Sequence, residues 1–381
     1  MSDGVYGMLP REKMEPHVRK YWDFMTLVPG APLFQQEFGF FTLERWRREE
    51  GLPENADLSA LFGYDNPASV SLGGLGGCEA PFEPKFTEAV LEDRGDYELV
   101  RDFAGRSVLC FKNRRNGFMP EYVDHPVKDM RTWEENCKWR LNPNSPERQA
   151  AMNEYLPRAV ALAQRGYMVE QYLVGGYMYL RSLMGPEGLL FMFYDAPELI
   201  HDCMQVWFAL ADNIIARHQR TVSIDLLLFD EDICYNHGPL ISPDMIREFL
   251  LPYYQQLVWN ARKRQLDGTR TLYMHAASDG FFDPVIDLYR EAGMRCLSPF
   301  EVASGSDVVR TGMAYPDLLI TGGIDKRVLA GSIEGIDRMA DSILPAMRAR
   351  GGYVPTCDHG VPEEVPLNNY LHYRRRCLEF G

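Results

Sequence analysis

The chain has 381 residues, of which 46% are apolar and 25% are charged, as in ordinary globular proteins with a sizeable core. Its formal net charge is −14, and acidic and basic residues are mixed along the sequence, which excludes nucleic acid and anionic membranes as main partners. No apolar run reaches the roughly 18 residues that span a bilayer. The eight cysteines form no Cys-x-x-Cys pair, which predicts reduced thiols and a cytoplasmic location.

The amino-terminal part contains one predicted strand and one glycine-rich loop. Residues 1–16 have no apolar segment, so we expect no signal peptide. Residues 32–39 (PLFQQEFG) are predicted to form the first strand. The stretch 71–80 (SLGGLGGCEA) follows no convincing strand, and we interpret it as a flexible loop rather than a phosphate cradle.

Residues 85–113 show a different pattern, in which two turn signals separate three strand-like runs. The turns are Arg94-Gly95-Asp96 and Ala104-Gly105-Arg106. Short strands joined by such turns are typical of an antiparallel meander. We therefore predict a β insertion over about residues 80–115, at the mouth of the main domain.

From about residue 160, short apolar runs alternate with stretches of helical spacing. The clearest helix carries an apolar stripe from Leu329 to Met347, at intervals of three and four residues. Alternating strands and helices predict a parallel sheet, either open and doubly wound or closed into a barrel. The predicted strands in this part are 167–174, 224–232, 271–275, 294–301, 317–325 and 353–359.

Polar strand ends decide between these two architectures. They are Asp230-Glu231-Asp232, His275, Glu301 and Asp358-His359. Barrels collect functional groups from many strand ends at one face, whereas open sheets usually rely on one glycine-rich turn, which is missing here. We predict an α/β fold: a single (β/α)8 TIM barrel over residues 1–381, with an eighth strand that is short, irregular or hidden around 180–200.

Five segments then share a pattern with a known family. They are TLERWRREEGLP (42–53), FDEDICYNHGPLISPDMIREFLLPYY (229–254), HAASDGFFDPVIDLYREAGMRCLSPFEVASGSDVV (275–309), GGIDKRVLAGSIEGI (322–336) and GGYVPTCDHGVPEEVPLNNY (351–370). Together they resemble the uroporphyrinogen decarboxylase superfamily. That resemblance implies a (β/α)8 barrel and either tetrapyrrole decarboxylation or methyl exchange with corrinoid proteins or coenzyme M.

The chain departs from the decarboxylases near its start. Those enzymes open with an arginine-rich stretch that binds the carboxylates of the substrate, but no arginine lies between Pro32 and Glu44. Guanidinium groups are the side chains that grip carboxylates bidentately. The sequence therefore resembles the methyltransferase branch more than the true decarboxylases.

Resemblance to the methyltransferases implies a zinc site. Coenzyme M methyltransferases bind zinc through His-x-Cys and a later Cys; here His275 fits the first position, Ala277 replaces the thiolate, and the later Cys aligns with His359. The more distantly similar cobalamin-independent methionine synthases add a glutamate, and Glu301 occupies a comparable place. His and Glu both suit zinc, so we predict His275, Glu301 and His359 as its ligands.

Other residues near these strand ends complete the predicted site. Cys357 and Glu231 are alternate ligands, and a hydrogen-bonded acid/base cluster without metal is the other interpretation. Glu231 and Asp279 are the predicted catalytic acids. Strand alternation sends Glu231 to the side opposite Asp230 and Asp232, and Asp279 in its Ser-Asp-Gly turn is either catalytic or a helix cap.

These features predict transfer of a methyl group from a small methylated substrate, such as a methoxylated aromatic, to the cobalt of a corrinoid protein. Zinc would act as a Lewis acid on an ether oxygen, and Glu231 would supply the proton. The chain shows no cobalamin-binding module, so cobalamin would be carried by that partner; the resemblance also implies a homodimer. The alternatives are a uroporphyrinogen-type decarboxylase and a ligand-binding protein without catalysis.

Overall fold

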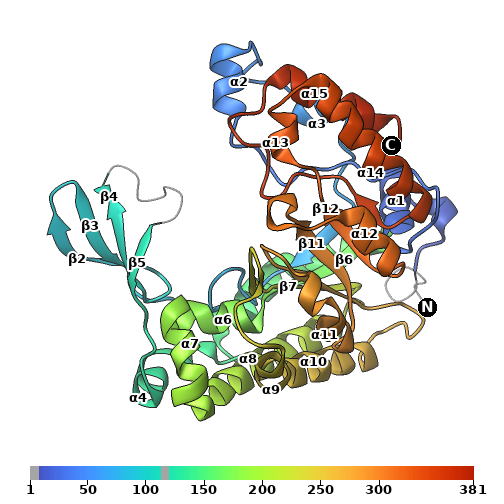
Figure 1. Cartoon of the computed structure of the whole chain (residues 1–381). Helices are drawn as coiled ribbons and strands as arrows, with labels where there is room; N and C mark the ends of the chain where they lie inside the picture. Colours follow the sequence, from blue (N-terminus) through green and yellow to red (C-terminus); the bar gives the residue numbers. More distant parts are fainter. Residues whose placement is uncertain (1–7, 113–119) are drawn as a thin grey trace.

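The computed structural model describes residues 8–112 and 120–381 (Figure 1). Its main body is a curled sheet of seven parallel strands in the order β1-β6-β7-β10-β11-β12-β13, with helices around it. The predicted TIM-barrel-like fold is thereby confirmed. The start of the segment expected to lack a signal peptide (1–7) and the end of the predicted insertion (113–115) lie outside the described residues.

The elements have the following bounds. The parallel strands are β1 (Ser69–Leu72), β6 (Met168–Val174), β7 (Leu226–Asp230), β10 (Tyr273–Ala277), β11 (Met294–Phe300), β12 (Leu319–Gly322) and β13 (Tyr353–Val354). The helices are α1 (Pro16–Met25), α2 (Leu43–Glu49), α3 (Leu58–Phe62), α4 (Met130–Thr132), α5 (Pro146–Gln164), α6 (Gly176–Met184), α7 (Pro186–Asp195), α8 (Pro197–His218), α9 (Pro243–Phe249), α10 (Leu251–Lys263), α11 (Ile286–Glu291), α12 (Val308–Ala314), α13 (Lys326–Leu329), α14 (Ile333–Arg350) and α15 (Leu367–Leu378). Short 3-10 or π turns cover Arg11–Lys13, Trp133–Cys137, Lys138–Leu141, Asp283–Val285 and Val302–Ser304.

Two predictions about the strands are corrected. The glycine-rich stretch 71–80 does follow a strand, because β1 pairs in parallel with β6 just before it. The region 180–200, where an eighth strand was expected, is helical in α6, α7 and α8. The strand β1 is short and contains two serines, and such a segment carries little strand signal.

The segment 32–39 is not a strand, but it fills the gap between the two edges of the sheet. Its Gln35 carbonyl accepts from the Asp65 amide at 2.9 Å, and the Phe41 amide donates to the Val361 carbonyl at 2.9 Å. Alternate residues Gln36 and Phe38 line the barrel interior. The predicted first strand is therefore an irregular extended segment in the position of the eighth strand, and its hydrogen bonds lie mainly at its two ends.

Helix α1 closes the amino-terminal end of the barrel. Its apolar residues Val18, Trp22 and Met25 are buried against the first residues of the parallel strands, such as Met168 and Leu226. The Trp22 indole also donates to the Gly166 carbonyl at 2.8 Å. Because described side chains pack this end, we expect a ligand to enter the barrel from the carboxyl ends of the strands.

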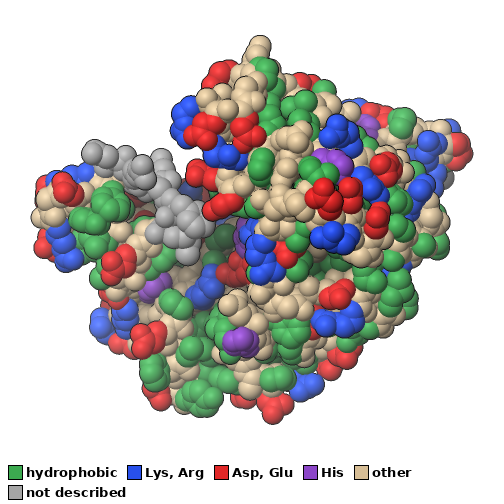
Figure 2. All heavy atoms as spheres, turned by 45° about the horizontal axis from the view of Figure 1, so that its top comes forward, with side chains coloured by type: hydrophobic (Ala, Val, Ile, Leu, Met, Phe, Trp, Pro, Cys, Tyr) green, Lys and Arg blue, Asp and Glu red, His purple; other side chains and the backbone are tan. Residues whose placement is uncertain are grey.

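The predicted insertion is confirmed as an antiparallel sheet of β2 (Ala89–Arg94), β3 (Tyr97–Arg101), β4 (Ser107–Phe111) and β5 (Glu121–Asp124). Figure 1 shows it projecting from the barrel body. Figure 2 shows a hollow in the surface between the insertion and the barrel. A two-stranded pair, β8 (Cys234–Tyr235) and β9 (Gly238–Pro239), follows β7. Within the described residues, no helix is both long and apolar enough to cross a membrane.

Candidate functional site

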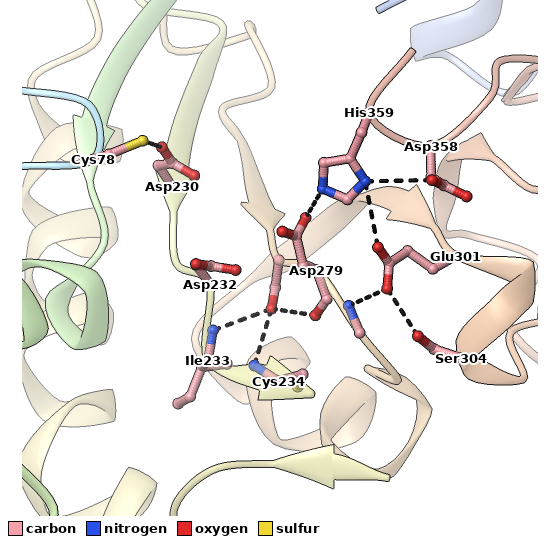
Figure 3. Close-up of polar contacts among 12 residues, drawn as sticks. Cys78, Asp230, Asp232, Ile233, Cys234, Asp279, Glu301, Ser304, Asp358 and His359 are labelled. Atoms are coloured by element: carbon pink, nitrogen blue, oxygen red, sulfur yellow. Dashed lines mark hydrogen bonds and ion pairs between the residues drawn. The ribbon is translucent and has the colours of Figure 1, made fainter. Parts of the chain in front are cut away.

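Three ionisable side chains meet where β10, β11 and β13 run out. Asp279 follows β10, Glu301 follows β11, and His359 lies five residues after β13. One ligand-type atom from each lies within 4.8 Å of the others, and Figure 3 shows His359 between the two carboxylates. Parallel strands end at one edge of a sheet, so groups far apart in sequence converge there.

His359 is held by carboxylates on both sides of its ring. Its Nε2 lies 2.7 Å from Asp279 Oδ1, and its Nδ1 lies 3.3 Å from both Glu301 Oε1 and Asp358 Oδ1. Hydrogen bonds to Asp279 and Asp358, together with the charge of Glu301, raise the pKa of His359 to about 10. In the absence of a bound cation, the imidazole is therefore a protonated counter-ion in an acidic cluster.

Backbone and hydroxyl donors fix the carboxylates around this ring. Glu301 Oε2 accepts from the Gly280 amide at 2.7 Å and from the Ser304 hydroxyl at 2.8 Å. Asp358 pairs with Lys326. Burial works against ionisation of Asp358, but hydrogen bonds from His359 and Lys326 hold its pKa below the usual value. The carboxylates are thus positioned before any ligand arrives.

A mouth pocket of about 280 Å³ opens beside this cluster. Asp230 Oδ2 there accepts from the Tyr172 hydroxyl at 3.0 Å and faces the Cys78 thiol at 3.1 Å. Asp232 pairs with Arg181 at 2.5 Å. Burial raises the pKa of Asp232, and the Arg181 guanidinium offsets only part of this effect.

Backbone strain marks the same place. Among the described non-glycine residues, positive φ occurs at Leu27, Asp232 and His359, with φ of 43° at Asp232 and 51° at His359. Such conformations are uncommon and cluster at functional sites, where the surrounding structure enforces them. Two of the three cases lie at the mouth, which independently supports a functional role for it.

His275 does not join this cluster. In the sheet it pairs with Leu228 and Cys296, one inward-facing layer below the level of Ala277 and Asp230. Its Nε2 lies 2.7 Å from the Ser298 hydroxyl, and burial lowers the pKa of His275 to about 4, so the imidazole is neutral. His275 therefore lines the interior of the barrel rather than its mouth.

Cys357 also lies outside the cluster. It is fully buried, it forms a bridge with Ile324 beside β12, and its amide donates to Glu37 Oε1 at 3.0 Å. Burial, and then the charges of Glu37 and Asp358, raise the pKa of the Cys357 thiol well above its usual value. A neutral thiol is a poor metal ligand.

Glu231 lies on the opposite side of the sheet from the mouth pocket. Both of its carboxyl oxygens accept from the Tyr254 hydroxyl, at 2.8 and 2.7 Å, and Oε1 accepts from the Tyr289 hydroxyl at 2.7 Å. Burial raises the pKa of Glu231 to about 7 despite these bonds. Helices α10 and α11 supply the two tyrosines, so Glu231 ties the barrel wall to its outer helices.

This packing gives a stability prediction for Gly175→Ala. A Cβ at Gly175 would lie 2.1 Å from Glu231 Oε2 and 2.8 Å from the Asp230 carbonyl. Overpacking of this kind is expected to lower the free energy of unfolding by about 1–3 kcal/mol. The measurement is urea unfolding followed by circular dichroism.

Gly188→Ala is the matched control, because nothing lies within 4 Å of its added Cβ and the residue sits inside α7. Alanine is the better helix former, so this variant should be as stable as the parent chain or slightly more stable. Equal unfolding midpoints for the two variants would contradict this prediction, because they would show that the residues around Gly175 move to accommodate the added methyl group at no cost.

The sequence interpretation placed Asp230 and Asp232 at a polar strand end without giving them a role. It did not single out Arg181, Cys78 or Phe38, although all five residues lie at or near the mouth. A usable signal was present for the two aspartates. They flank Glu231, so period-two alternation sends them together to one face and Glu231 to the other. Nothing local marks Cys78, Phe38 or Arg181, because long loops and other elements bring them in.

Comparisons with known proteins identify the family and support the fold. The family model described as "Uroporphyrinogen decarboxylase (URO-D)" matches residues 169–377. A uroporphyrinogen decarboxylase of Crocosphaera subtropica is 28% identical over 181 residues, which is 47% of this chain and 47% of that protein. The chain thus spans about half the length of the curated relative it matches. A methyltransferase from Methanosarcina mazei has the same fold, with a TM-score of 0.58 and 13% identity over 96% of this chain and 98% of that one.

Proposed function

The chain belongs to the uroporphyrinogen decarboxylase family, and we propose that it is a methyltransferase of that family. The reaction is transfer of a methyl group from a small methylated substrate, such as a methoxylated aromatic, to the cobalt of a separate corrinoid protein. The fold likeness over nearly the full chain to a methanogen methyltransferase supports this choice.

One observation carries the proposal: the Asp279–Glu301–His359 cluster stands at the mouth of a largely apolar cavity inside the barrel. No Lys or Arg is among the described residues that line the cavity or the mouth pocket. Polycarboxylates need guanidinium or ammonium partners. The arrangement therefore suits a small, mainly apolar substrate that reacts at one end.

The donor set fits a zinc ion. Imidazole nitrogen and carboxylate oxygen are both ordinary zinc ligands, and Asp279, Glu301 and His359 would hold the ion. His359 must release a proton to bind it, as imidazole ligands do. The chemistry that zinc supplies in such a site is Lewis-acid activation of an ether oxygen.

The protein's own residues have separable roles in the proposed reaction. Glu301 orients His359 and is itself fixed by the Gly280 amide and the Ser304 hydroxyl. Asp232 lines the mouth pocket, and we assign to it the delivery of a proton to the leaving oxygen. Glu231 was first expected in that role, but it lies on the other face of the sheet, where it accepts hydrogen bonds from Tyr254 and Tyr289.

The corrinoid protein would dock over the hollow between the β insertion and the barrel body (Figure 2). Its cobalt would then approach the mouth from the carboxyl ends of the strands. We also propose a homodimer, on family resemblance alone.

The second candidate is decarboxylation of a uroporphyrinogen-type substrate. The matching family model and the C. subtropica relative favour it. The lining without Lys or Arg weighs against it, since such a substrate carries many carboxylates.

The test mixes the protein, reconstituted with zinc, with cob(I)alamin and a panel of methyl ethers, methylamines and methyl thioethers. We expect the absorbance to change to that of methylcobalamin with at least one methyl ether, and no change without protein. Failure with every donor, combined with release of carbon dioxide from uroporphyrinogen, would instead establish the decarboxylase.

A further inference from the structure

The barrel interior contains a cavity of about 410 Å³ below the mouth. This volume lies in the range of small-molecule sites, roughly 300–1,000 Å³. The cavity shares Phe38, Ala277 and Ser298 with the mouth pocket. A molecule inside it can therefore present one end to the Asp279–Glu301–His359 cluster.

Aromatic and aliphatic side chains form most of the cavity wall. Phe24 and Met25 of α1 lie at the closed end, Tyr172 and Leu228 line the middle, and Phe38 lies near the mouth. Aromatic walls favour flat aromatic ligands through stacked or edge-on contacts. The shape and lining thus fit one substituted ring.

The floor carries a carboxyl group, that of Glu170, which has no role in the proposed transfer. Glu170 lies four residues before Val174, whose partner in the sheet is Asp230. At about 3.3 Å per strand residue, Glu170 is roughly 13 Å below the acids of the mouth. A ring bound between them would have its reacting end at the mouth and its opposite end at Glu170.

Glu170 also lacks a cation. The Tyr21 hydroxyl donates to its Oε1 at 3.1 Å, and among the described residues no Lys, Arg or His forms an ion pair with it. Burial raises the pKa of Glu170. Ser69 and Tyr21 are its hydrogen-bond partners, and its carboxyl group faces the cavity, where it can accept a further hydrogen bond from a ligand.

We propose that this cavity binds the ring of the methyl donor and that Glu170 selects donors whose far end carries an uncharged hydrogen-bond donor, such as a hydroxyl group. A hydroxyl can donate to the Glu170 carboxyl. A ring carboxylate would instead add a second acid to a cavity without a cation, so that at most one of the two carboxyl groups could stay ionised. This inference rests on the proposed function for the reacting end of the substrate, and it assigns the other end.

The test is a binding measurement on the full chain without cobalamin or a corrinoid protein. Isothermal titration calorimetry compares 4-methoxyphenol with 4-methoxybenzoate, which differ at the far end of the ring. We expect the phenol to bind about 100-fold more tightly, since a ring carboxylate would be buried without a cation and one of the two acids would have to take up a proton. In Glu170→Gln, which keeps the size and removes the titratable carboxyl group, the ratio should fall below about tenfold.

Two further variants keep the result interpretable. Glu154→Gln, at an exposed position on α5, should leave the ratio as in the parent chain. Glu170→Met keeps the side-chain volume without polarity, and it should weaken the phenol about tenfold by removing its acceptor. This second variant decides the matter if Glu170→Gln does not fold, as judged by thermal unfolding.

Equal affinity of the parent chain for the two ligands would overturn the inference, and so would a ratio that Glu170→Gln leaves unchanged. Neither outcome bears on methyl transfer, which is assayed separately with cob(I)alamin. Conversely, a Glu170-dependent ratio without methyl transfer from any ether would leave the cavity as a phenol site and remove the proposed function.

Discussion

Replacing His359 by alanine is expected to lower the rate of methyl transfer to cob(I)alamin by about 10²- to 10⁴-fold, the range for loss of a central acid, base or metal-positioning group. The imidazole contacts Asp279 at 2.7 Å and Glu301 at 3.3 Å, so its removal leaves these two acids without the cation between them. The zinc content of protein purified without chelator should fall with the rate, because one ligand is lost.

His372→Ala is the matched control for this variant. His372 also contacts a carboxylate, with Nε2 at 2.8 Å from Asp337 Oδ1, but it lies on α15 away from the mouth. Its removal should change neither the rate nor the zinc content. A His359→Ala protein that transfers methyl groups at the parental rate would exclude the mouth cluster as the reaction centre.

Asp225→Ala is expected to have the largest effect on stability, a loss of about 3–5 kcal/mol in the free energy of unfolding. Asp225 immediately precedes β7, and its carboxylate accepts from Arg270 at 2.5 and 2.7 Å and from the Val169 amide at 2.8 Å. The Asp225 side chain is 0% exposed and the Arg270 side chain is 6% exposed, so the variant leaves the Arg270 guanidinium buried and unpaired. Chemical denaturation with a two-state fit measures the loss.

Two comparisons separate burial from pairing in this result. Glu92→Ala breaks an exposed pair with Arg94 in the insertion and should produce no measurable change. Adding Arg270→Met to Asp225→Ala removes the orphaned charge and should recover part of the loss. If Asp225→Ala unfolds at the parental denaturant concentration, the Asp225–Arg270 ion pair does not stabilise the packing of β6, β7 and β10 at their amino-terminal ends.

Several elements could be predicted because their signals are local. Buried parallel strands appear as apolar runs between helical stretches, which identified β6, β7 and β10 to β13. Tight-turn residues identified the antiparallel insertion. The extended segment 32–39 was predicted as a strand because its side chains do alternate, with Gln36 and Phe38 facing the barrel interior. Its backbone, however, forms hydrogen bonds mainly at the two ends of the segment.

The same local reasoning predicted part of the site. Glu301 and His359 follow apolar runs, and a strand end is visible in the sequence, so both were expected at one face of the barrel. His275 was expected with them and instead lies one inward-facing layer below, beside Ser298. Asp279, four residues later, was predicted as a catalytic acid rather than as a ligand, and it is the group that meets His359.

The sequence by itself determined the alternation of strands and helices from about residue 160, the family resemblance, and which ionisable groups stand near strand ends, because each of these depends on neighbours along the chain. Only the tertiary structure decided which of those groups meet. Side chains alternate with a period of two and a strand rises by about 3.3 Å per residue, so one step separates Asp232 at the mouth from Glu231 behind the wall. The stagger of strands around a barrel then sets the height of each strand end. That stagger depends on the packing of the whole sheet, so it cannot be predicted from any single segment of the chain.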